Sequence, residues 1–114
     1  MKKGGIMDEK QFYSEGDLII PEGSFQRDAF IIDKGSVEVS QMDKDGKKVV
    51  IAIRGEKEII GEMALIEGNA RCATVIALED CELSILPFEK FQNLPDSNPG
   101  VKAIKKIMNE RREK

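Results

Sequence analysis

The chain has 114 residues, of which 40% are hydrophobic and 34% charged, with a formal net charge of −3 and no histidine. One domain is the default at this length, and the composition can build a core, which argues against global disorder. The lack of histidine excludes an imidazole base, Ser–His and Cys–His nucleophile pairs and most catalytic zinc sites. The slightly acidic balance does not attract polyanions, so we expect no nucleic-acid partner.

The two cysteines and the N-terminus indicate the cellular compartment. Cys72 and Cys81 form no CxxC pair and are too few for a disulfide framework. Both have apolar neighbours, which predicts buried thiols in a reducing compartment. Residues 1–5 carry two positive charges but no apolar run follows them, and the longest apolar stretches, such as residues 49–53, are too short to span a bilayer. We predict a cytoplasmic protein without membrane insertion.

Short runs of alternating hydrophobic residues dominate the first two thirds of the chain. The clearest runs are residues 29–32, 36–40, 49–53, 73–78 and 81–85. They are rich in β-branched residues and bounded by Gly, Asp and Pro, which is typical of an all-β sandwich or barrel. Their regular spacing favours a roll of hairpins over a βαβ arrangement. The pattern alone does not decide the strand topology.

The sequence Asp-Lys-Asp-Gly at residues 43–46 resembles the start of a calcium loop. An EF-hand needs an oxygen ligand at the next alternate position, which is Lys47, and it needs helices on both sides. The flanking residues alternate as strands do, and Asp-Gly is a common hairpin turn. We therefore predict a hairpin turn at Asp45 and Gly46.

The pattern changes to a helical one near residue 87. Phe88, Phe91 and Leu94 share one helical face, with Pro87 suited to the first turn, and residues 95–100 then interrupt the helix. A second amphipathic helix follows, and its apolar stripe consists of Val101, Ile104, Ile107 and Met108. We expect its basic residues to face solvent; these are Lys102, Lys105, Lys106, Arg111 and Arg112.

Residues 59–75 carry the strongest indication of a binding site. Gly61 allows a tight turn or the close approach of a ligand, and residues 62–66 favour a single helical turn. The start of such a turn offers free N–H groups to an anion, which Arg71 on the next strand could also bind. Glu62 suits a sugar hydroxyl, so the residues together predict a site for a singly charged phosphate attached to a ribose. The alternative is a Glu62–Arg71 ion pair that only caps the connection.

A family resemblance favours the ligand site. Residues 61–66, Gly-Glu-Met-Ala-Leu-Ile, and residues 70–75, Ala-Arg-Cys-Ala-Thr-Val, resemble the phosphate-binding cassette of the cyclic-nucleotide-binding domain family. That cassette reads Gly-Glu-x-Ala-Leu, a few residues, then Pro-Arg-x-Ala-Thr-Val. Residues 35–39 resemble the family's Gly-x-Val-x-Val strand, and the resemblance extends from about Phe12 to the end of the chain.

The resemblance implies a mainly β fold. It predicts an eight-stranded β-roll with jelly-roll topology at about residues 11–87, including a short cassette helix. Two C-terminal helices would follow at about residues 87–94 and 99–112. We expect residues 1–114 to form a single domain with no helix-turn-helix, channel, kinase or cyclase region.

The resemblance also implies a role for each cassette residue. Gly61 and the N–H groups near Met63 and Ala64 would hold the cyclic phosphate. Glu62 would accept a hydrogen bond from the ribose 2′-hydroxyl, and Arg71 would pair with the phosphate.

Two cassette positions depart from the family pattern. Ala70 replaces the usual Pro, which we expect to loosen the loop without removing a contact. Cys72 stands where Thr often accompanies a preference for cyclic GMP and Ala a preference for cyclic AMP. Its thiol is a weak donor, and we favour a small buried hydrophobe at this position.

The implied function is that of a sensor that binds a cyclic nucleotide, cyclic AMP in preference to cyclic GMP, without an enzymatic step or a cofactor. Ile104, Ile107 and Met108 would act as a lid over the ligand, and the signal would pass to an unknown protein effector. The competing interpretation places this stripe permanently in the core or in the seam of a homodimer. Two other classes stay open: a β-roll interaction domain that binds no nucleotide, and a cupin-like enzyme, which the lack of histidine almost excludes.

Overall fold

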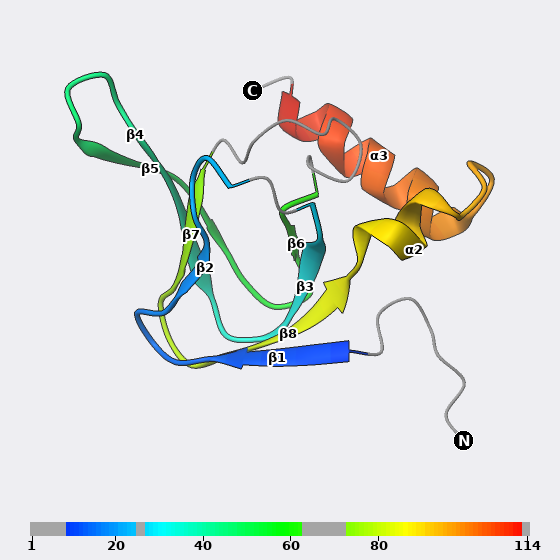
Figure 1. Ribbon diagram of the computed structural model, residues 1–114, viewed down its shortest axis with the longest axis horizontal. Helices are drawn as coiled ribbons and strands as arrows, with labels where there is room; N and C mark the ends of the chain where they lie inside the picture. Colours follow the sequence, from blue (N-terminus) through cyan, green and yellow to red (C-terminus); the bar gives the residue numbers. More distant parts are fainter. Residues whose placement is uncertain (1–8, 25–26, 63–72, 113–114) are drawn as a thin grey trace.

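The computed structural model describes residues 9–24, 27–62 and 73–112, which form a roll of two facing β-sheets followed by helices (Figure 1). The first sheet has the strand order β1 (Glu9–Tyr13), β8 (Cys81–Leu86), β3 (Ala29–Lys34), β6 (Ile59–Ile60). The second has the order β2 (Leu18–Ile20), β7 (Thr74–Ala77), β4 (Val37–Met42), β5 (Lys48–Arg54). Neighbouring strands are antiparallel. The described residues confirm the predicted eight-stranded β-roll.

The strands that the sequence predicted each have four or more residues. Strands β3, β4, β5, β7 and β8 coincide with the predicted alternating runs. Strands β1, β2 and β6 were not located by pattern. β1 is exposed over most of its length, and β2 and β6 have three and two residues, which is too short for a period to be visible.

The main core lies between the two sheets. Its buried members come from both sheets and the adjoining turns; they are Ile19, Ile20, Phe30, Ile32, Val37, Ile60, Val75, Ala77, Cys81, Leu83 and Ile85. The Cys81 thiol donates to the carbonyl oxygens of Ser36 and Glu79, at 3.3 and 3.1 Å, and burial raises its pKa. Cys81 is thus the buried thiol that the sequence predicted, whereas Cys72 lies outside the described residues.

The turn between β4 and β5 is the hairpin that the sequence predicted. The Asp43 carboxylate accepts hydrogen bonds from the N–H groups of Asp45 and Lys47, both at 2.8 Å. Gly46 has a φ of 80°, and its N–H donates to the Asp43 carbonyl. The Asp43 side chain therefore stabilises the turn itself, as aspartate does in Asx turns.

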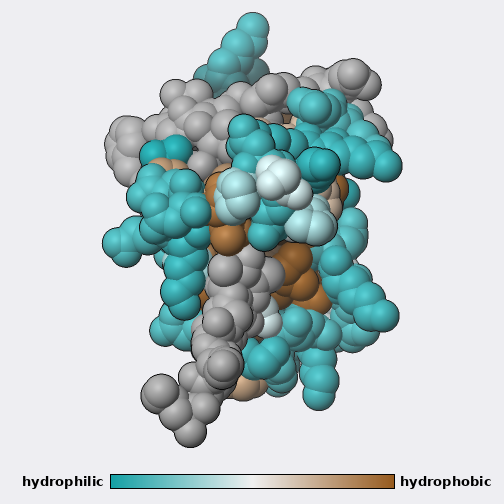
Figure 2. All heavy atoms as spheres, turned by 90° about the vertical axis from the view of Figure 1, so that its right-hand side faces the viewer, coloured by the Kyte–Doolittle hydropathy of each residue, from teal (hydrophilic) through white to brown (hydrophobic). Residues whose placement is uncertain are grey.

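The two helices cover one end of the first sheet. Helices α2 (Phe88–Gln92) and α3 (Pro99–Arg112) contribute to a second apolar cluster, whose buried members are Ala29, Ile59, Leu86, Phe91, Val101, Ile104 and Met108. Pro87 occupies the N-cap of α2 and not its first turn, which corrects the sequence-based prediction. The Phe88 N–H, at the start of α2, has no partner within the helix, and it donates a hydrogen bond to the Asp28 carboxylate at 2.8 Å. On the side of the molecule where these helices lie, the described residues are largely hydrophilic at the surface (Figure 2).

A polar network occupies the outer side of the first sheet where the helices do not cover it. Lys10 pairs with Asp33 at 2.8 Å and with Glu82 at 3.4 Å, and Ser84 donates to the same Asp33 carboxylate. The hydrogen bonds from Lys10 and Ser84 lower the pKa of Asp33, and the bond to Asp33 raises the pKa of Lys10. The network thus joins β1, β8 and β3 through side chains. In the described part of the chain, no helix is long and apolar enough to cross a membrane.

Candidate functional site

The candidate site begins where β6 ends. Ile60 of β6 pairs with Phe30 of β3 in the first sheet, and Gly61 and Glu62 follow directly. Gly61 has a φ of 76°, a conformation that side-chain-bearing residues rarely adopt. This turn redirects the chain so that Glu62 is buried, although its side chain carries a carboxylate. A buried carboxylate needs a partner, because leaving a charge unpaired away from water is costly.

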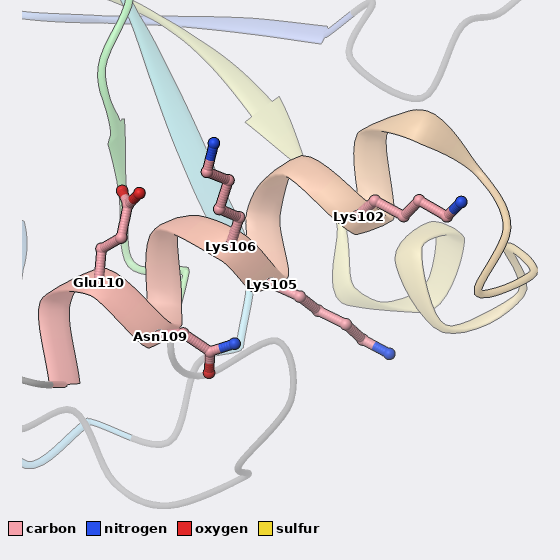
Figure 3. A pocket seen from close by; sticks show the side chains of 5 residues that line it. All are labelled: Lys102, Lys105, Lys106, Asn109 and Glu110. Atoms are coloured by element: carbon pink, nitrogen blue, oxygen red, sulfur yellow. The ribbon is translucent and has the colours of Figure 1, made fainter.

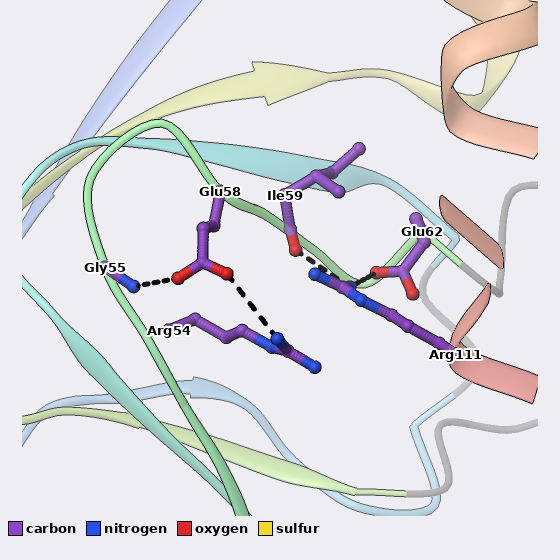
Figure 4. Close-up of polar contacts among 6 residues, drawn as sticks. All are labelled: Arg54, Gly55, Glu58, Ile59, Glu62 and Arg111. Carbon is purple, nitrogen blue, oxygen red and sulfur yellow. Dashed lines mark hydrogen bonds and ion pairs between the residues drawn. The ribbon is translucent and has the colours of Figure 1, made fainter. Parts of the chain in front are cut away.

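The partner of Glu62 comes from the last turn of α3. Figure 4 shows the Arg111 guanidinium between Glu62 and the backbone of Ile59. It donates to Glu62 Oε1 at 2.7 Å and to the Ile59 carbonyl oxygen at 3.0 Å. The Glu62 side chain is 5% exposed and that of Arg111 22%, so both charges are largely removed from solvent. The prediction that Arg111 faces solvent is therefore wrong. The guanidinium is held against the protein because it pairs with the buried Glu62 carboxylate.

This ion pair joins two parts of the chain that sequence reasoning treated separately. Glu62 and Arg111 are 49 positions apart, and no local spacing signals their contact. The sequence-based alternative paired Glu62 with Arg71, which lies outside the described residues. In the part of the chain that the structure describes, Glu62 is bound to α3 instead. The described contacts use Oε1 of the carboxylate and leave Oε2 able to accept a further hydrogen bond.

The remaining cassette residues cannot be placed beside this pair. Met63, Ala64, Arg71 and Cys72 lie outside the described residues, as does most of the predicted cassette helix. Their predicted contacts with a phosphate and a base stay predictions.

The apolar stripe of α3 is packed against the roll. Val101, Ile104 and Met108 are buried, and Ile107 is partly buried, in the cluster that includes Ile59 of β6. Arg111 continues this contact by bonding to the backbone of the same residue, Ile59. The helix therefore contacts the segment that leads into Glu62 through both apolar and charged groups. The role of Ile104, Ile107 and Met108 as a lid concerns movement and stays a prediction.

A second ion pair lies near the first but is far more exposed. Glu58 accepts a hydrogen bond from the Gly55 N–H at 2.7 Å and pairs with Arg54 at 3.5 Å (Figure 4). This contact closes the turn between β5 and β6. The Glu58 side chain is 42% exposed, so the pair is screened by water in a way that the Glu62–Arg111 pair is not.

A shallow hollow of about 380 Å³ lies on α3 and is lined by polar side chains (Figure 3). The lining residues are Lys102, Lys105, Lys106, Asn109 and Glu110. Lys105 pairs with Asp96 at 3.2 Å. The three lysines are on the exposed side of the helix, as the sequence predicted. Within the described residues, no group of three or more acidic or cysteine side chains is placed to hold a metal ion.

Comparison with known proteins gives a family match over most of the chain. The family model described as cyclic nucleotide-binding domain matches residues 10–98. The regulator of Salmonella typhimurium named cAMP-activated global transcriptional regulator CRP is 32% identical over 90 residues, which are 78% of this chain and 43% of that protein. The cyclic AMP receptor protein of Thermus thermophilus is 28% identical over 78 residues, 68% of this chain and 36% of that protein.

Solved structures resemble the fold over similar spans. The catabolite activator protein of Thermus thermophilus superposes with a TM-score of 0.82 at 27% identity, covering 91% of this chain and 49% of that one. The structure described as cAMP bound PfPKA-R gives a TM-score of 0.74 at 31% identity, covering 78% of this chain and 32% of that one. The chain spans about half or less of the length of each of these proteins.

Proposed function

Because the chain belongs to the cyclic nucleotide-binding domain family, we propose that it is a sensor module that binds a cyclic nucleotide, cyclic AMP in preference to cyclic GMP. The observation that carries this proposal is the family match over residues 10–98, which includes the whole cassette. The preference for cyclic AMP is supported by the names of two similar proteins, a cAMP-activated global transcriptional regulator and the cAMP-bound PfPKA-R.

In the proposed site each cassette residue contacts one part of the ligand. Gly61 and the N–H groups near Met63 and Ala64 hold the cyclic phosphate, and Arg71 pairs with its charge. Glu62 accepts a hydrogen bond from the ribose 2′-hydroxyl. The positive φ of Gly61 supports its role in the turn that holds the phosphate. The burial of Glu62 supports its role at the ribose, because a buried acceptor discriminates strongly against a ligand that lacks the hydroxyl. In this proposal the Cys72 thiol would lie beside the base.

The proposed output is a change in α3. The helix and the ribose use the same carboxylate: Arg111 bonds to Glu62 Oε1, and the 2′-hydroxyl would bond to Oε2. A ligand that orders Glu62 therefore also favours the docked position of α3, which is a coupling between two sites. The stripe of Ile104, Ile107 and Met108 acts as the lid in this scheme. The module binds its ligand without a chemical step, works in the cytoplasm and passes the signal to a protein effector.

Calorimetric titration with cyclic AMP and cyclic GMP tests the proposal. We expect binding of both, with the higher affinity for cyclic AMP. Removal of one charge-assisted phosphate contact by Arg71→Ala should weaken binding by about a hundredfold. The control is Arg54→Ala, which removes a partly exposed arginine outside the cassette and should leave the affinity unchanged.

A second arm of the same titration examines the sugar. We expect 2′-deoxy cyclic AMP to bind the native protein about tenfold or more weakly, because one hydrogen bond to a charged acceptor is lost. Glu62→Gln should narrow this difference. Absence of binding heat with either nucleotide would contradict the proposed function and favour an interaction domain. Equal affinity for the deoxy ligand would contradict the role of Glu62 alone.

A further inference from the structure

The second sheet presents a row of side chains on its outer side. The strand register places Leu18 opposite Ile76, Ile76 opposite Glu38, and Glu38 opposite Ile53, so that these four residues cross the whole sheet. Residues one position along the strands point to the other side of the sheet. Val37, for example, is completely buried in the core between the sheets. The row therefore lies on the side of the sheet that faces away from the core.

This outer side is apolar and exposed. Val50 and Met42 extend the row along the β4–β5 hairpin, Leu78 extends it beyond β7, and Ile51 lies at the bulge in β5. We call this set the apolar outer face. Its exposed fractions are 53% for Leu18, 57% for Met42, 47% for Val50, 50% for Ile51, 55% for Ile53 and 40% for Leu78. Single exposed hydrophobic residues are ordinary, but a contiguous set indicates an interaction surface.

The first sheet provides an internal comparison. Part of its outer side is covered by α2 and α3, and the rest carries the network of Lys10, Asp33, Glu82 and Ser84. The fold therefore does not require an exposed apolar sheet surface. The apolar outer face has no corresponding cover among the described residues.

The size of the face suits a protein partner. Six half-exposed aliphatic side chains present on the order of 400 Å² of apolar surface. One side of a standard protein interface buries about 800 Å², somewhat more than half of it apolar. The face thus supplies most of the apolar part of one such side.

The charges on the molecule favour a second copy of the same chain as that partner. Among the residues that the structure describes, the charged ones in the register rows of this face are Glu38 and Lys48, which pair within the chain at 2.7 Å. A twofold axis brings the same surface of two copies together, and a surface with one charge of each sign is complementary to itself. The hollow on α3 is less suited to self-association, because its three lysines outnumber its one glutamate, and two copies of a positively charged surface repel each other.

We propose that two copies of this chain associate face to face through the apolar outer face, with Glu38 of each copy near Lys48 of the other. This interface buries the hydrophobic side chains of β2, β4 and β5 and uses the two charges to set the orientation of the copies. It does not depend on nucleotide binding.

Sedimentation equilibrium of the native chain and of Ile53→Lys tests this surface. We expect a dimer for the native chain. Because the lysine places a charge within the apolar outer face, we expect the dissociation constant of the variant to be raised by about a hundredfold or more. The matched control is Phe12→Lys, which makes the same kind of change at an exposed residue of β1 in the other sheet and should leave the dimer intact. Thermal unfolding of both variants confirms that they fold.

Two single charge reversals test the orientation. Glu38→Lys gives a face with two positive charges and Lys48→Glu one with two negative charges, so each variant should dimerise more weakly than the native chain. An equimolar mixture of the two should restore dimers. A native chain that stays monomeric at high concentration would overturn the proposal and leave the face to a different protein. Equal weakening by Phe12→Lys, or no gain on mixing, would also overturn it.

Discussion

Replacing Arg111 with methionine should lower the free energy of unfolding by about 2–4 kcal/mol, a large effect for one residue at the end of a helix. Methionine keeps the length and apolar contacts of the side chain but removes its donors. The Glu62 carboxylate would then be buried without its ion-pair partner, and the Ile59 carbonyl would lose a hydrogen bond. The expected loss of stability is smaller than the loss for a fully buried ion pair, because Arg111 is partly exposed.

The matched control for this change is Arg54→Met. Arg54 forms a longer ion pair with Glu58, and that pair is substantially exposed, so its loss should cost less than about 1 kcal/mol. Urea unfolding of the two variants and the native chain measures both effects. Equal losses of stability would mean that the Glu62–Arg111 contact contributes no more than an ordinary surface pair.

Gly35→Ala should destabilise the fold by about 2–5 kcal/mol. This range is the sum of two costs: the strain of an alanine at a positive φ and the overpacking caused by its Cβ atom. Gly35 has a φ of 100°, and a Cβ atom there would lie 2.7 Å from both the Asp80 carbonyl oxygen and the Cys81 sulfur. Neither neighbour can move easily, because one is backbone and the other is buried in the core.

Gly46→Ala separates strain from overpacking. Gly46 also has a positive φ, 80°, but nothing lies within 4 Å of the position of its Cβ atom. We expect a loss of only about 1–2 kcal/mol, the strain alone. Thermal unfolding of the two variants gives the comparison, and an equal decrease in melting temperature would show that the close contact at Gly35 relaxes without cost.

The parts of the fold that could be predicted are those with a local signal. Residues 81–85 alternate because every second side chain of β8 faces the core, and the Asp-Gly turn at residues 45–46 requires a residue of positive φ. The second helix could be predicted from its apolar stripe. β6 could not, because two isoleucines have no period of their own and are buried through their pairing with β3.

The candidate site, too, could be predicted only where the sequence carries a local signal. Gly61 and Glu62 could be found from their motif, and the structure shows that Gly61 adopts the backbone conformation that such a turn needs. Arg111 was assigned to the solvent side of its helix, because helical position does not reveal a buried carboxylate brought near by the fold. The run at residues 49–53 predicted a strand, but the bulge between its pairings with Val39 and Ser40 decides which side chains are left exposed.

Amide hydrogen exchange across residues 101–108 tests most directly whether the bound ligand is linked to α3. These amides belong to a helix whose order comes from docking, since a helix of this length is only marginally stable alone. If cyclic AMP orders Glu62 and thereby the Arg111 contact, their exchange should slow several-fold when the protein is saturated with ligand. Exchange that is equally slow with and without bound cyclic AMP would contradict the lid and place the helix permanently in the core.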